Sequence, residues 1–167
     1  MNRLTAVFAL LMLASAAIAG AQAKNPCTFL SKAEIESVLG VKVSGLDGSN
    51  NMGGTQACSG VAKNRMSVMI MYVTSNQNQK VADPMGYLEA ESRKSAQSIG
   101  AKMDVKRSGN ILCTTLIPPK QGPYSTQCMV GKLPNSMASI AVMVTTEQEM
   151  VPIDKLLPLA QKMVGRF

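Results

Sequence analysis

The amino-acid sequence predicts a single α+β domain in which an antiparallel β-sheet is covered by about three helices and held by two disulfides. Short segments in which apolar and polar residues alternate predict the strands. Three other segments carry helix start signals or an apolar residue at every third or fourth position, and these predict the helices. The four cysteines of the chain can supply the two disulfides.

Residues 1–23 have the order of a cleaved secretory signal, because Arg3 is followed by an apolar run and then by small residues. Cleavage after Ala23 is favoured, and cleavage after Ala19 is the alternative. The expected mature domain, residues 24–167, is then periplasmic or secreted. No other segment approaches the length of a transmembrane span, so none is expected.

The first helix of this domain has a start and an end that are both encoded locally. Ser31 and Glu34 have the spacing of a capping box, in which each side chain accepts a hydrogen bond from the backbone of the other residue. Leu30 and Ile35 have the spacing of a hydrophobic staple. Gly40 can adopt the left-handed conformation that ends a helix. The short apolar stripe of this helix must pack on a sheet to be stable.

Three strands are expected in the first half of the chain, and they should pair as an antiparallel meander. The segments are 41–46, 56–62 with Cys58, and 65–74, which is the most strongly apolar. Residues 47–54 are polar and rich in glycine, so they are predicted to form a loop.

The second helix is predicted to start at Asp83, as the N-cap, and Pro84, in the first turn. Gly100 is expected to end it. Its predicted inner face consists of Met85, Leu88, Ser92, Ala96 and Ile99.

The second half of the chain should contain four strands and the last helix. The strands are expected at 101–107, 111–117, 124–131 and 137–145. The helix has a wide apolar face, and Pro158 should point away from that face and kink the helix without ending it. The predicted apolar face consists of Ile153, Leu156, Leu157, Ala160, Met163, Val164 and Phe167.

The two halves also resemble each other. A shift of 71 residues places the apolar segment 66–74 over 137–145, with Cys58 one position away from Cys128. The pattern predicts a two-fold pseudo-repeat of cysteine strand, turn, long strand, connector and helix. Chance similarity between two apolar strands is the alternative.

The cysteines can pair in three ways. Pairing of Cys27 with Cys58 and of Cys113 with Cys128 is favoured, because nested or crossed pairings would have to span the middle of the domain. Each loop of this length should stabilise the fold by roughly 3 to 4 kcal/mol in the chain-entropy model.

The start of the expected mature domain resembles a family of small exported bacterial proteins and lipoproteins. The resemblance rests on the segment Cys27-Thr28-Phe29-Leu30, on Glu34, Leu39 and Gly40 at their spacings, and on a final helix that closes on Arg166. Two cysteine pairs are similar as well. This family is largely without an assigned function, so the resemblance implies an α+β fold and little else.

No catalytic, cofactor-binding or metal-binding residue is predicted, and the chain is not expected to be an enzyme. It contains no histidine, which removes the commonest general base. Glu34 is assigned to the helix cap. Glu36, Glu89 and Glu91 fall on polar helix faces, where solvated carboxylates are the simplest interpretation.

Methionine is unusually abundant, and Met66, Met69 and Met71 lie close together. Thioether sulfur suits Cu(I), and Met69 and Met71 share one face of a strand, so a copper site is one hypothesis. The favoured interpretation is that methionine fills the core in place of aromatic residues, in a strand buried on both sides.

Removing Arg3 with the leader lowers the formal net charge from +7 to +6, which favours anionic partners. One cluster could form a basic patch for lipopolysaccharide, an acidic glycan or an acidic protein, although a solvated face is the simpler interpretation. Nucleic-acid binding is not expected, because no aromatic residues are interleaved. The cluster consists of Arg93, Lys94, Lys102, Lys106 and Arg107.

These observations favour an exported, non-enzymatic binding protein of unknown ligand, such as an inhibitor, an immunity-type protein or an envelope-associated protein-binding module. The expected partner is another exported protein or an anionic component of the envelope. The alternative is a periplasmic copper-handling protein that uses methionines.

Overall fold

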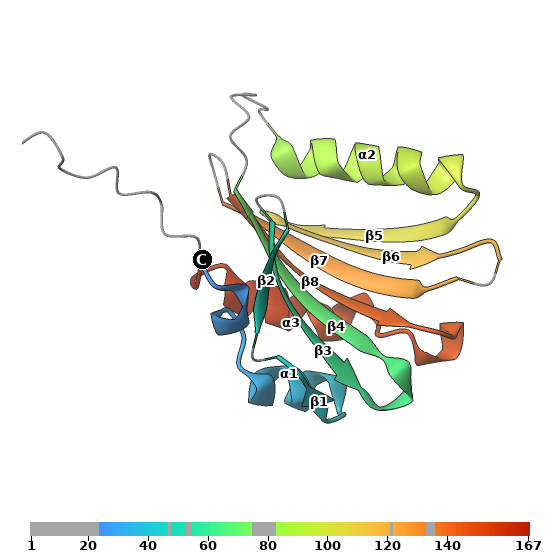
Figure 1. Cartoon of the computed structure of the whole chain (residues 1–167). Coiled ribbons are helices and arrows are strands. Elements are labelled where there is room, and N and C mark those ends of the chain that lie inside the picture. Colours follow the sequence, from blue (N-terminus) through green and yellow to red (C-terminus); the bar gives the residue numbers. More distant parts are fainter. Residues whose placement is uncertain (1–23, 47, 53–54, 75–82, 121, 133–135) are drawn as a thin grey trace, which may run out of the picture.

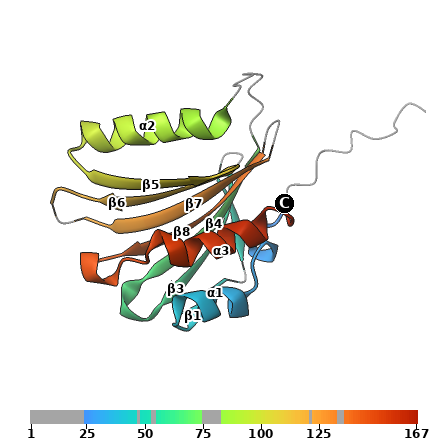
Figure 2. The ribbon, with the colours of Figure 1, turned by 180° about the vertical axis from the view of Figure 1, so that it is seen from behind.

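The structure is a computed structural model, and its described residues form one sheet with helices on both faces (Figures 1 and 2). The predicted secretory signal lies outside them. The described ranges are 24–46, 48–52, 55–74, 83–120, 122–132 and 136–167.

All strands of the sheet pair antiparallel, in the order β1-β3-β4-β8-β7-β6-β5, and β2 pairs with β3 beside β1. The α+β prediction is therefore confirmed. The strands are β1 (Val43–Ser44), β2 (Ser49–Met52), β3 (Thr55–Ala62), β4 (Ser67–Thr74), β5 (Lys102–Ser108), β6 (Ile111–Ile117), β7 (Tyr124–Lys132) and β8 (Ser136–Val144). The helices are α1 (Lys32–Leu39), α2 (Pro84–Ser98) and α3 (Ile153–Met163), with short 3-10 turns at Pro26–Thr28, Lys63–Arg65 and Glu147–Glu149.

The expected loop at 47–54 is wrong in its middle part, where the chain forms β2. Ser49 pairs with Cys58 and Met52 pairs with Thr55, so β2 and β3 make a hairpin. The polar composition of this segment gave no strand signal. Its pairing is decided by the neighbouring strand, which supplies the backbone partners that the local sequence cannot specify.

One face of the sheet, which we call the first face, carries the main core and both disulfides. Cross-strand register places Cys58, Ile70, Ile140, Cys128 and Cys113 in one row across five strands, and all of them are buried. The predicted disulfides Cys27–Cys58 and Cys113–Cys128 are both present. The first ties the segment before α1 to β3, and the second joins two adjacent strands.

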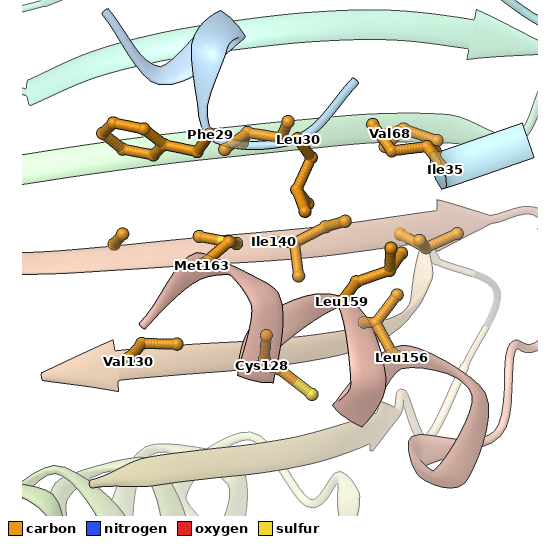
Figure 3. Packing of buried hydrophobic residues seen from close by; sticks show 14 of the residues in the cluster. Phe29, Leu30, Ile35, Val68, Cys128, Val130, Ile140, Leu156, Leu159 and Met163 are labelled. Atoms are coloured by element: carbon orange, nitrogen blue, oxygen red, sulfur yellow. The ribbon is translucent and has the colours of Figure 1, made fainter. Parts of the chain in front are cut away.

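Helices α1 and α3 cover the first face. Figure 3 shows Leu156, Leu159 and Met163 of α3 beside Ile140 of β8, and each of these side chains is buried. Leu159 was missed in the predicted apolar face. Helix α3 continues through the exposed Pro158, as predicted.

The prediction for Val164 was wrong, because this residue is 38% exposed. Val164 is the C-cap and keeps helical backbone angles, but the buried face is centred on Leu156, Leu159 and Met163, which leaves Val164 at its edge. Phe167 is buried nevertheless, and packs with Phe29 and Tyr72 at ring-centroid distances of 5.8 and 6.2 Å.

Glu34 joins the two helices of the first face. The capping box with Ser31 is present, because Ser31 N donates to Glu34 Oε2 at 2.9 Å and Glu34 N donates to Ser31 Oγ at 3.2 Å. The same carboxylate accepts two hydrogen bonds from Arg166, at 2.8 and 2.9 Å, and one from Lys162 at 3.2 Å. The Arg166 guanidinium, followed by the Ser31 amide, lowers the pKa of Glu34 far below its ordinary value.

Helix α2 packs on the opposite side of the sheet, which we call the second face (Figure 1). Asp83 caps it by accepting from Gly86 N at 3.0 Å, and Gly100 follows it with φ of 69°, as predicted. Met85 of α2 forms a small buried cluster with Leu112 and Met129.

The prediction that Ile99 is buried on the inner face of α2 is wrong. This residue is 56% exposed, because the helix ends at Ser98 and Ile99 follows as the C-cap. Met85 and Ala96 are buried on that face, and Leu88 and Ser92 are half-buried.

The internal repeat needs a different register from the predicted 71-residue shift. That shift overlays Val68, which faces the first side, on Ser139, which lies opposite Met71 on the second side. Cys58 and Cys128 are 70 positions apart and face the same side, so the hairpins β3-β4 and β7-β8 correspond with that shift. The helices that follow them, α2 and α3, lie on opposite faces, so the correspondence is limited to the hairpins.

The open part of the second face as candidate functional site

The candidate functional site is the part of the second face that α2 leaves open. Helix α2 packs against β5 and β6, at one side of the sheet. In Figures 1 and 2 it runs above β5, away from β3 and β4. Among the described residues, no helix covers the second face over β3, β4 and β8. We call this surface the open face.

Met69 and Met71 lie on the open face, which overturns the prediction of a strand buried on both sides. Burial alternates along β4, where Val68 and Ile70 are buried and the two methionines are half-buried. The alternation arises because helices pack against the first side of this strand alone. Met69 and Met71 are therefore partly accessible to solvent, while Met66 packs against the first-face core.

Strand β8 adds two further methionines that the sequence analysis did not connect with these. Register places Met143 opposite Ser67 and Met137 opposite Val73, on the same face as Met69 and Met71. Both are half-buried, and Met137 also packs against the cluster of Met85, Leu112 and Met129 beside α2. Their alternation along 137–143 was visible in the sequence, but the pairing of β4 with β8 was not.

A groove of about 430 Å³ runs between α2 and the adjoining strands of the second face. Its apolar walls include Leu88 and Ile99 of the helix segment and Leu116 of β6. Its polar side chains make no side-chain hydrogen bond to any other described residue, so they are available to a ligand. These polar side chains are Glu91, Ser92, Ser95, Thr114, Ser125 and Gln127.

A second depression, of about 480 Å³, lies at one end of the open face. Its lining includes Arg65, Ser67, Pro123 and Met143. Arg65 has φ of 60°, a left-handed conformation that is uncommon for a residue with a side chain. Its side chain is exposed and makes no ion pair within the described part of the chain, and it adds a positive charge to the depression that Met143 lines.

The predicted basic cluster of Arg93, Lys94, Lys102, Lys106 and Arg107 does not form one free patch. Arg93 pairs with a carboxylate one turn earlier on α2, at 2.8 Å. Arg107 pairs with Asp83 at the start of α2, whereas Lys106 reaches Asp154 of α3, on the other face, at 2.6 Å. The Arg107 guanidinium lowers the pKa of Asp83, and Asp83 raises that of Arg107. Two of the five cations, Lys106 and Arg107, thus link helices to β5.

Two of the three carboxylates predicted on polar helix faces have structural partners, whereas Glu91 lines the groove without a side-chain hydrogen bond to another described residue. Glu36 accepts from Val43 N at 2.9 Å and from Lys42 Nζ at 3.0 Å, and these contacts lower its pKa. Glu89 pairs with Arg93. In the described ranges, acidic and cysteine side chains are not grouped as metal ligands. The open face therefore offers apolar, hydroxyl and thioether groups for binding.

No helix in the described part of the chain is both long enough and apolar enough to cross a membrane. No protein-family profile, curated protein sequence or solved structure matches this chain.

Proposed function

We propose that this protein is an exported, non-enzymatic binding protein that holds a segment of another exported protein on its open face. The observation that carries the proposal is the contrast in covering. Two helices close the first face of the sheet, whereas α2 covers the second face over β5 and β6 and leaves half-buried methionines beside it. Partly exposed apolar surface of this kind commonly marks an interaction site.

The chemistry of the open face suits a polypeptide segment. Methionine side chains are flexible and adapt to irregular apolar partners. The adjoining groove supplies hydroxyl groups and the Gln127 amide, which can bond to the backbone of an extended chain. A volume of about 430 Å³ accommodates a few residues of such a chain.

The charge near the site favours a partner segment that is apolar with acidic flanks. Arg65 lies in the depression beside Met143. The formal net charge of the chain outside the predicted leader is +6, which attracts an acidic partner before contact. Two disulfides support a location outside the reducing cytoplasm.

The test is a pulldown from an extract of exported proteins with a matched pair of variants of α2. Ser95→Trp places a large ring in the groove, whereas Gln97→Trp adds the same ring at an exposed position that does not line the groove. A stoichiometric protein partner should be retained by the wild type and by Gln97→Trp and lost by Ser95→Trp.

Equal retention by both variants would remove the groove beside α2 from the binding site. Retention of a small molecule without any protein would replace the protein partner with a ligand of the groove. Mass spectrometry of the eluted material distinguishes these results.

A further inference from the structure

We infer that the open face carries a soft-metal site, in which pairs of methionine thioethers from β4 and β8 bind Cu(I). The inference does not depend on a protein partner. It concerns Met143, Met69, Met71 and Met137, which we call the thioether ladder. These residues follow one another in a zigzag across two adjacent strands.

The geometry of the ladder follows from strand register. Met69 and Met71 are two residues apart on one strand face, about 7 Å between Cα atoms. Met143 lies opposite Ser67, so it is the diagonal neighbour of Met69, and Met137 is likewise the diagonal neighbour of Met71. Diagonal neighbours on a sheet face are about 7 to 8 Å apart, which long side chains can span. Each successive pair can therefore hold one ion between its sulfur atoms.

Small residues beneath the ladder leave space for this arrangement. Ala141 lies opposite Met69, and Ser139 lies opposite Met71. They are 8% and 2% exposed, and their short side chains leave room on β8 that the longer methionine side chains beside them can reach. Met69 and Met71 stay partly accessible to solvent.

The donor set selects a soft monovalent ion. Thioether sulfur favours Cu(I), whereas harder ions need imidazole, carboxylate or carbonyl ligands. The chain contains no histidine, and all four cysteines are in disulfides. On the second face of β3, β4 and β8, the described side chains are apolar, hydroxyl or thioether groups, without a carboxylate. Methionine is therefore the soft donor that the protein can offer.

The absence of an ionisable ligand gives the site a distinctive pH dependence. Cysteine, histidine and carboxylate ligands must lose a proton to bind a metal, so their affinity falls in acid. A thioether has no proton to lose. Cu(I) affinity should therefore change less than about twofold between pH 5 and pH 8, where a site built on histidine or cysteine would lose at least tenfold.

The experiment is an anaerobic titration of the purified, disulfide-intact chain with Cu(I), kept reduced by ascorbate. Binding is measured by competition with a colorimetric chelator and by NMR of the methionine ε-methyl groups. Saturable binding with a micromolar or lower dissociation constant is expected. The methyl signals of the ladder should shift, and that of the buried Met163 should not.

Leucine variants give the matched control, because exchange of methionine for leucine nearly conserves volume. The double variant Met69→Leu with Met71→Leu should weaken Cu(I) binding at least tenfold. Met103→Leu should leave it unchanged, because Met103 lies on the same face but in the groove beside α2. Absence of binding at micromolar Cu(I), or full binding by the quadruple leucine variant of the ladder, would overturn the inference.

Discussion

The two faces of the sheet are built from different side chains although they share the same strands. The first face packs branched aliphatic residues such as Ile70 and Ile140 against α1 and α3, with a disulfide at each end of their row. The second face is rich in methionine. Its methionines are Met69, Met71, Met103, Met129, Met137 and Met143, joined by Met85 of α2.

Because of this difference, the first face should provide stability and the second face should adapt to a binding partner. Branched side chains have few rotamers and pack at high density, so they specify one arrangement. Methionine has three rotatable side-chain bonds and accepts several arrangements. We therefore expect the free energy of unfolding to depend mainly on the first face, and binding to depend mainly on the second.

The largest expected difference in the free energy of unfolding is between alanine substitutions at two neighbouring residues of β4 that point to opposite faces. Ile70→Ala should lower the free energy of unfolding by about 4 kcal/mol, because Ile70 is fully buried and its loss leaves a cavity. Met71→Ala should cost about 1 kcal/mol, because Met71 is only half-buried. Urea denaturation measures both values. Equal costs would mean that the open face is covered in solution.

Removal of the disulfides should have the next largest effect on the free energy of unfolding. The Cys27→Ala and Cys58→Ala double variant opens a loop with a separation of 31 residues and should cost about 4 kcal/mol. The Cys113→Ala and Cys128→Ala variant opens a loop of 15 residues and should cost about 3 kcal/mol. Thermal unfolding of each variant, with the wild type reduced as a reference, tests this order. The opposite order would show that strain or residual structure outweighs loop entropy.

Glycine-to-alanine substitutions test how well each face of the sheet accommodates an added methyl group. A Cβ at Gly60 would lie 2.7 Å from the Ser44 carbonyl oxygen and from Leu46, so Gly60→Ala should cost about 2 to 3 kcal/mol. A Cβ at Gly131 would lie 2.7 Å from the end of the Met85 side chain, which can move. Gly131→Ala should therefore cost less than about 1 kcal/mol. Similar losses in chemical denaturation would contradict an adaptable second face.

The ion pair that joins α1 to α3 should contribute less than Ile70, the disulfides or Gly60. Glu34→Gln should cost about 1 to 2 kcal/mol at neutral pH, since it weakens the helix cap and the contacts to Lys162 and Arg166. The same substitution should make stability less dependent on pH in acid.

The direction follows from the lowered pKa of Glu34. The folded protein binds fewer protons at this group than the unfolded chain, so its contribution is complete above the ordinary value of 4.5 and is lost as the pH falls toward the folded value. Unfolding curves between pH 2 and 7 should show a shallower slope for Glu34→Gln. An unchanged slope would remove Glu34 from the acid response.

Much of the fold could be predicted because its signals are local. The capping box at Ser31, the start of α2 at Asp83 and the end of α1 at Gly40 each depend on residues within one or two turns. The candidate site was predicted less well. Met69 and Met71 were identified, but they were placed in a core, and Met137 and Met143 were not joined to them.

The sequence alone determined the starts of α1 and α2, the end of α1 and the alternation within most strands, because each depends on neighbouring residues. Tertiary structure decided which strand lies beside which, and therefore which faces are covered. The pairing of β4 with β8 brings methionines 66 or more residues apart onto one surface. The packing of α2 over β5 and β6 leaves that surface open. A periodic pattern shows that a side chain has a preferred face, but contacts between distant segments decide what lies against it.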